Sequence, residues 1–180
     1  MRWLALSLVL LLAGCGGIQL DEVNPQGVDL TGTWVLDKSA SDATPDFKEG
    51  LRDRRQRRRN DQVAERRRDV LAAAGSGFAF ITHDFQVLTA ETLTIEQNND
   101  SMGIAHAPGV YRDISWGERQ RGLWEVYAGW EVTDLVIISK APDLSVQERY
   151  RLNASRLSVE LTIKADDRER VVTRVFRKQS

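Results

Sequence analysis

The sequence has few of the residues that usually carry catalysis or bind metals. Its 180 residues include one cysteine and two histidines. His83 and His106 lie far apart in the chain, and neither stands at a zinc-ligand spacing. A Gly-x-Ser-x-Gly nucleophile motif, a phosphate-binding loop and a dinucleotide fingerprint are also missing. We therefore expect no catalytic residues, no bound metal and no cofactor, and we do not expect an enzyme.

Long apolar runs are scarce too, and the most prominent one lies at the start of the chain. It extends from Trp3 to Leu12, directly after the cation at Arg2. A helix that spans a bilayer needs roughly 20 apolar residues, so this run is too short to be one. A cation, a short apolar run and small residues at the cleavage point are instead typical of a secretory signal peptide.

The residues that end this run resemble a bacterial motif. Leu12-Ala13-Gly14-Cys15 is similar to the lipobox of bacterial lipoprotein precursors. The resemblance implies that residues 1–14 are removed and that Cys15 is acylated, for example with palmitate. Because Gly16 follows where an aspartate would indicate retention, it also implies delivery to the outer membrane. We expect a protein of the bacterial cell envelope, anchored to the outer membrane by lipid and facing the periplasm. The alternative is a plain signal peptide that leaves Cys15 as a free thiol.

The rest of the chain suits one domain with an uneven distribution of charge. Removal of the signal peptide would leave 166 residues, enough to bury a core. Residues 15–29 are small and polar and predict a tether, and residues 30–180 form the folded body. The net charge is −1, yet residues 45–69 hold ten Lys or Arg against six Asp or Glu. The sequence therefore predicts a mildly acidic body with one basic insertion.

Alternation of apolar and polar residues dominates the body. The segments 92–96 and 157–163 are clear examples, and a period of two is typical of half-buried strands. About eight such segments follow one another, and the short turns between them join antiparallel neighbours. An up-and-down meander of this kind keeps two open edges unless it closes on itself. We therefore predict a mainly β fold, a closed antiparallel barrel of about eight strands.

The first strand resembles the start of a lipocalin-like, or calycin, barrel. Those barrels open with a Gly-x-Trp whose indole packs near a basic residue of the last strand. Here Gly32-Thr33-Trp34 stands on the first predicted strand, and Arg174 or Arg177 stands on the last. The resemblance implies that Trp34 and Arg174 close one end of the barrel. The chain departs from the family pattern because more than fifty residues separate the first strand from the next clear one.

The insertion after the first strand predicts a helix over residues 45–74. Thr44 can cap it, Pro45 suits its first position, and glycines at 75 and 77 end it. Five arginines stand where this helix has almost nothing apolar to bury: Arg54, Arg55, Arg57, Arg58 and Arg59. They form either a solvated face or a contact for anionic lipid, lipopolysaccharide or an acidic protein. Nucleic acid is not expected as a partner. Residues 78–89 stay open between an edge strand, a plug and a second short helix.

Three residues in the middle of the meander are candidates for ligand binding. Trp130, Glu148 and Tyr150 face inward in the predicted registers. Aromatic residues there either fill the core or line a cavity, since a barrel of about eight strands holds side chains or one small ligand. A buried carboxylate needs a partner, so Glu148 either pairs with an arginine, which we favour, or orients a ligand. The candidate arginines are Arg112, Arg156 and Arg174.

Two functions follow from these features. The first is an envelope lipoprotein that binds or shields a small apolar or amphipathic molecule inside its barrel. The second is a non-catalytic interaction or scaffolding lipoprotein with a packed barrel, whose arginine-rich helix contacts anionic lipid or an acidic partner. An open interior favours the first function, and a filled interior favours the second.

Overall fold

The computed structural model describes residues 18–44, 77–165 and 168–179. These ranges contain ten strands, one α-helix and one 3-10 turn. In chain order they are β1 (Gly32–Leu36), α3 (Gly77–Asp84), η2 (Gln86–Leu88), β2 (Thr92–Gln97), β3 (Ser101–Ala107), β4 (Tyr111–Ser115), β5 (Gly117–Arg121), β6 (Trp124–Glu131), β7 (Asp134–Ala141), β8 (Leu144–Asn153), β9 (Arg156–Ala165) and β10 (Arg168–Lys178).

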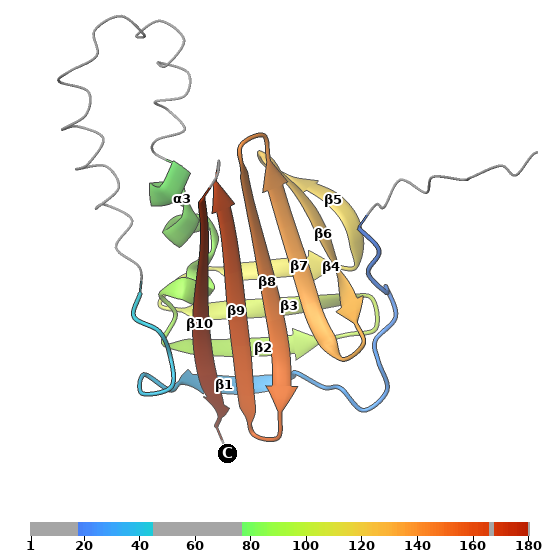
Figure 1. Cartoon of the computed structure of the whole chain (residues 1–180). Coiled ribbons are helices and arrows are strands. Elements are labelled where there is room, and N and C mark those ends of the chain that lie inside the picture. The colour runs from blue at the N-terminus through green and yellow to red at the C-terminus, as the bar shows by residue number, and fades with distance from the viewer. Residues whose placement is uncertain (1–17, 45–76, 166–167, 180) are drawn as a thin grey trace, which may run out of the picture.

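The strands form one antiparallel sheet that curls into a nearly closed barrel. Its order is β4-β3-β2-β1-β10-β9-β8-β7-β6-β5, so the first and last strands of the chain are neighbours. Figure 1 shows β1, β2 and β3 crossing behind β8, β9 and β10, which gives the barrel two layers. The order ends at β4 and β5, which Trp116 joins along the chain. The predicted lipocalin-like meander is confirmed, with ten strands instead of about eight.

Alternating apolar residues fill much of the barrel. On β9, the four inward residues from Leu157 to Ile163 are at most 1 % exposed, and polar residues separate them. Trp34, Tyr150 and Phe176 are among the largest fully buried side chains. Each such side chain stabilises the fold by roughly 1.5–3 kcal/mol through burial alone. The core is therefore continuous through the layers rather than an empty channel.

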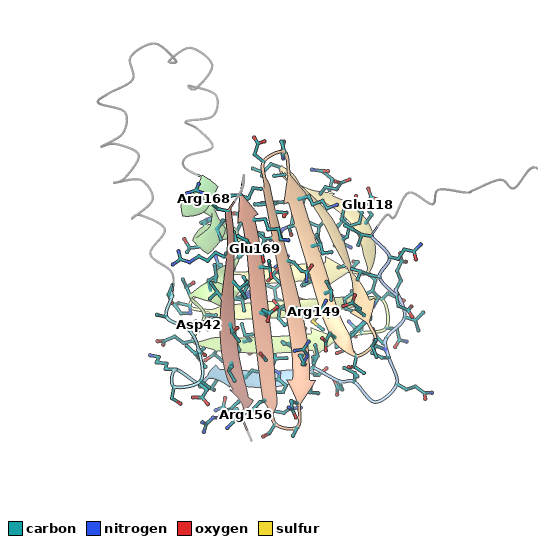
Figure 2. All side chains as sticks on the ribbon, in the orientation of Figure 1. Asp42, Glu118, Arg149, Arg156, Arg168 and Glu169 are labelled. Carbon is teal, nitrogen blue, oxygen red and sulfur yellow. The ribbon has the colours of Figure 1, made fainter. Side chains whose placement is uncertain are left out.

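The outer face of the barrel is polar. Arg149 of β8, labelled in Figure 2, forms ion pairs with Glu131 and Asp134 on the neighbouring β6–β7 hairpin. Arg151 binds the same Asp134 carboxylate, with an Nη2–Oδ2 distance of 2.8 Å. Ion pairs at a surface usually contribute about 0–1 kcal/mol each. The fold therefore depends mainly on its inner face.

The connection between β1 and β2 packs against the core. Most of residues 78–89, for which the sequence left three possibilities open, lie in α3 and η2. Ile81, Phe85, Val87 and Leu88 of this segment are at most 2 % exposed, and η2 contacts both α3 and β10. The helix predicted over residues 45–74, with its five arginines, lies outside the described residues. No helix in the described ranges is long and apolar enough to cross a membrane.

Part of the predicted tether is fixed to the barrel, and we call residues 18–30 the N-terminal strap. Asp21 pairs with Trp130 through two backbone hydrogen bonds of 2.9 and 2.8 Å. Asn24 Oδ1 accepts a hydrogen bond from Trp130 Nε1 at 3.0 Å, and Asn24 Nδ2 donates to Asn98 O at 2.8 Å. Gly129 permits this approach, because a Cβ there would lie 2.7 Å from Asp21 O. A free tether therefore does not extend beyond residue 20.

Candidate functional site

A pocket of about 280 Å³ lies where the end of α3 meets the β3–β4 turn and the β5–β6 hairpin. We call it the mouth pocket. Its apolar lining consists of Phe85, Val110, Leu123, Trp124 and Val126. Its main polar lining residues are Asp84, Arg112, Arg121 and Ser139. An apolar wall with a few polar groups is the usual composition of a small-molecule site.

Trp124 forms the aromatic wall of the mouth pocket. It is the first residue of β6 and is 6 % exposed. Its Nε1 atom donates a hydrogen bond to Asp84 Oδ2 at 2.9 Å. Its ring meets the Phe85 ring edge to face, with centroids 5.2 Å apart. These two contacts join the end of α3 to β6 and hold the wall in place.

The rim of the mouth pocket consists of two exposed apolar residues on separate turns. Val110 is 54 % exposed and Leu123 is 64 % exposed. The backbone N–H of Val110 donates to Gln86 Oε1 at 2.8 Å, which fastens the β3–β4 turn to η2. At Gly109 a Cβ would lie 1.9 Å from the same oxygen, so only glycine permits this contact. The rim is therefore fixed on one side and exposed to solvent.

Arg112 and Glu148 form a buried ion pair beside the mouth pocket. Arg112 Nη1 donates to Glu148 Oε2 at 2.5 Å, and Tyr150 Oη donates to Glu148 Oε1 at 3.0 Å. Arg112 is 5 % exposed, and the other two residues are fully buried. Arg112 stands on β4 and Glu148 on β8, which are not neighbours in the sheet. The ion pair therefore crosses the barrel interior.

The buried surroundings shift the pKa values of Arg112, Tyr150 and Arg121. Burial lowers the pKa of Arg112, but the charge and hydrogen bond of Glu148, together with Tyr150 and Asp84, outweigh it and raise that pKa above its ordinary value. Burial, followed by the Glu148 charge, raises the pKa of Tyr150 well above its ordinary value, so its hydroxyl remains a donor. Burial, followed by repulsion from Arg112, lowers the pKa of Arg121. The two arginines of the pocket are thus electrostatically coupled.

His106 of β3 interacts with the same ion pair. It is 4 % exposed, and its Nδ1 lies 3.2 Å from the Val110 carbonyl oxygen, to which it can only donate. Burial lowers the pKa of His106, although the Val110 hydrogen bond and Glu148 oppose that shift. Its Nε2 has no hydrogen-bond partner among the described residues. A neutral imidazole with the proton on Nδ1 therefore supports the β3–β4 turn.

The structure separates the three residues that the sequence suggested for ligand binding. Glu148 and Tyr150 lie together, but neither lines the mouth pocket. Trp130 stands six residues beyond Trp124 on β6, a distance of about 20 Å along a strand. There its ring meets Trp116 edge to face, with centroids 5.7 Å apart. The favoured pairing of Glu148 with an arginine occurs, and the partner is Arg112.

The basic residue over Trp34 is Lys178 and not Arg174. Lys178 Nζ lies 5.3 Å from the centroid of the Trp34 ring, and Trp34 Nε1 donates to Leu30 O at 2.9 Å. The reason is the register, because Trp34 and Lys178 stand directly opposite each other on β1 and β10. Arg174 lies four residues earlier on β10, and its Nη1 donates to Asp42 O at 2.7 Å. Trp34 itself is fully buried.

Sequence reasoning missed Asp84, Phe85, Arg121 and Trp124 as site residues. Trp124 was visible within the aromatic cluster, but its position at the mouth depends on packing against α3. Cys15 and the five arginines of the insertion lie outside the described residues. In the part of the chain that the structure covers, no group of three His, Cys, Asp or Glu residues is arranged to hold a metal ion.

Comparison with known proteins relates this chain to others by fold alone. Neither a protein-family model nor a curated protein sequence matches it. Among solved structures, the wild-type fluorescent protein UnaG matches with a TM-score of 0.50 at 14 % identity, over 83 % of this chain and 97 % of that chain. A secretory abundant heat-soluble protein from Ramazzottius varieornatus matches with a TM-score of 0.50 at 12 % identity, over 87 % and 99 %. A zebrafish ileal bile acid-binding protein complexed with cholic acid has a TM-score of 0.48 at 14 % identity, over 83 % and 98 %.

The fold is therefore that of a lipocalin-like β-barrel. The two solved structures with a TM-score of 0.50 are covered almost completely by the alignment, so the similarity concerns the whole barrel and not one hairpin. In addition to the strands of the meander, the chain has a long connection between β1 and β2, which contains α3 and η2.

Proposed function

We propose that this protein is a non-catalytic binding protein that holds one small apolar or amphipathic molecule in the mouth pocket. The observation that supports this function is the pocket itself. Its aromatic and aliphatic wall is next to the buried Arg112 and the exposed Arg121. At about 280 Å³ it is near the lower end of the range for small-molecule sites, which begins at about 300 Å³. The occupant is accordingly small.

Two tryptophans on the same strand provide a matched test. Trp124 lines the mouth pocket, whereas Trp130 is buried at the other end of β6 and does not. Titration with the uncharged dye N-phenyl-1-naphthylamine should give a saturable fluorescence increase for the wild type. W124L should weaken dye binding by about tenfold or more, which corresponds to about 1.4 kcal/mol. W130L should leave it within about twofold once both variants are shown to be folded. Equal loss in both variants, or no saturable binding by the wild type, would contradict the proposal.

We also propose that the protein is held at the outer membrane by a lipid on Cys15. The support is the lipobox resemblance at residues 12–15, which lies outside the described structure. Several acyl chains anchor a protein firmly, since each buried methylene contributes about 0.8 kcal/mol. Replacement C15S should abolish incorporation of labelled palmitate and move the protein from the membrane fraction to the soluble fraction. A C15S protein that keeps both the label and the membrane association would disprove the anchor.

A second candidate function is supported by the filled interior of the barrel. Trp34, Met102, Tyr150 and Phe176 are fully buried, so most of the barrel has no room for a ligand. In that case the working surface is the arginine-rich insertion, and its partner is anionic lipid, lipopolysaccharide or an acidic protein. Replacing all five arginines from Arg54 to Arg59 with glutamine should then abolish cosedimentation with anionic vesicles at low salt. Unchanged cosedimentation would exclude this function, and dye binding in the mouth pocket would favour the first.

A further inference from the structure

We propose that Glu148 acts as a built-in counter-ion that makes the mouth pocket select uncharged amphiphiles over acids. This inference rests on the proposed binding function and names the class of ligand. The ligands that it favours carry a hydroxyl, ester or amide group on an apolar tail. Carboxylic acids of the same size bind more weakly, because the cation that could pair with them, Arg112, is already paired with Glu148.

The first step is the state of Arg112. Its guanidinium is the only buried cation in the lining of the mouth pocket that the structure describes. Its partner Glu148 is fully buried at 2.5 Å, and Tyr150 binds the second oxygen of the same carboxylate. Both carboxylate oxygens therefore have a donor, and the charge of Arg112 is compensated within the protein.

The second step is the cost that an acidic ligand meets. If its carboxylate displaces Glu148 from Arg112, a fully buried Glu148 loses its counter-ion. An unpaired charge in a buried site is strongly unfavourable. If the ligand instead binds beside the intact pair, two carboxylates share one guanidinium and repel each other. In neither arrangement does Arg112 raise the affinity for an acid above that for an uncharged ligand.

The remaining charges around the pocket do not change this balance. Arg121 is exposed, and an exposed ion pair contributes little to affinity. The Asp84 carboxylate also lines the pocket and would repel an acid. His83 at the rim is 81 % exposed by its side chain and is paired with Asp84 at 3.0 Å. Two carboxylates thus accompany the two arginines, and the pocket is close to electrically neutral.

The third step is what an uncharged ligand gains. A guanidinium has five N–H donors, and the Glu148 hydrogen bond engages one of them. A hydroxyl, ester or amide oxygen accepts from another donor of Arg112 without disturbing the ion pair. The tail of the ligand packs along Phe85, Trp124 and Val126. The polar end of the ligand thus has a hydrogen-bond donor, and its apolar tail has an apolar surface to pack on.

The test compares an alcohol and an acid of equal length as competitors for the dye. Octan-1-ol and octanoate each displace N-phenyl-1-naphthylamine at neutral pH, and the ratio of their inhibition constants is measured. The double variant R112M/E148L gives the baseline ratio, since replacing a buried ion pair by apolar residues is usually tolerated. The wild type should favour the alcohol at least as strongly as this baseline, because Glu148 repels the acid and Arg112 can still donate to the alcohol. A wild-type ratio shifted toward the acid by about tenfold would overturn the proposal, because Arg112 would then attract acids despite Glu148.

The single variant E148Q should convert the pocket into one that binds acids. It frees the charge of Arg112 while keeping a side chain of the same shape. We expect its ratio to shift toward octanoate by about tenfold or more, the effect of one hydrogen bond to a charged group. A folded E148Q with the wild-type ratio would contradict the proposal. If E148Q does not fold, the comparison of the wild type with R112M/E148L still decides the question. Absence of dye binding in the wild type would instead disprove the proposed function itself.

Discussion

Trp124 donates its indole N–H to the Asp84 carboxylate across 2.9 Å, and this bond fastens β6 to the end of α3. D84A removes the acceptor and leaves a mostly buried donor without a partner. We expect the free energy of unfolding in urea to fall by about 1–3 kcal/mol and dye affinity to fall with it. The matched control is H83A, because the His83 side chain is exposed and its pair with Asp84 contributes little. Equal effects of the two substitutions would show that the bond does not hold the pocket.

The buried ion pair should be far more sensitive to single than to double replacement. R112M leaves Glu148 charged and unpaired in a fully buried site, so we expect a loss of about 3–5 kcal/mol in urea unfolding. R112M/E148L should recover most of that loss, because no charge then remains buried. Additive losses in the double variant would mean that the two side chains act independently.

Acid should weaken the contact between the loop after β1 and strand β10. Hydrogen bonds from Ser39, followed by that from Arg177, lower the pKa of Asp37 from 3.8 to about 2. A carboxyl whose pKa is lower in the folded state stabilises the fold fully above 3.8, and this contribution is lost as the pH falls toward about 2. The stability of D37N should therefore lie below that of the wild type at neutral pH and converge with it in that acidic range. Urea unfolding at a series of pH values measures the difference, and R177Q should move the convergence to higher pH.

The N-terminal strap should contribute measurably to stability. N24A removes the acceptor of Trp130 Nε1 and the donor to Asn98 O, so we expect a loss of about 1–2 kcal/mol. Val23, the preceding residue, is 70 % exposed, and V23A should stay within about 0.5 kcal/mol of the wild type. If thermal or urea unfolding shows no difference between N24A and V23A, the strap is not held by Asn24.

The strands that the sequence predicted are those with an apolar inner face. β9 alternates strictly, and its buried residues are those expected from the period. β5, Gly117–Arg121, was missed because its five residues are GERQR and contain no apolar side chain. Its pairing with β6 supplies the backbone hydrogen bonds that make it a strand. Hydrophobic periodicity does not detect a strand of this kind.

The candidate site depended on contacts that sequence patterns do not encode. Alternation along β8 placed Glu148 and Tyr150 inward, and the cost of burying a charge required a partner for Glu148. Choosing Arg112 from among the arginines required the curvature of the sheet, since β4 and β8 meet only across the barrel. The mouth pocket required the packing of α3 on Trp124, which unites residues forty positions apart. The order of the strands can be inferred from neighbouring segments of the sequence. The site forms only when the sheet curls and brings distant segments together.

The strap also fixes how closely the protein can approach a membrane. Cys15 and Asp21 are six positions apart, which spans at most about 22 Å, whereas a free tether over residues 15–29 would reach about 50 Å. If Cys15 carries the lipid, the part of the barrel where Asp21 meets Trp130 lies within about 22 Å of the lipidated residue. The mouth pocket lies about 20 Å from Trp130 along β6. The distance between the mouth pocket and the anchored residue is then limited by the few residues before Asp21 and not by the full length of residues 15–29.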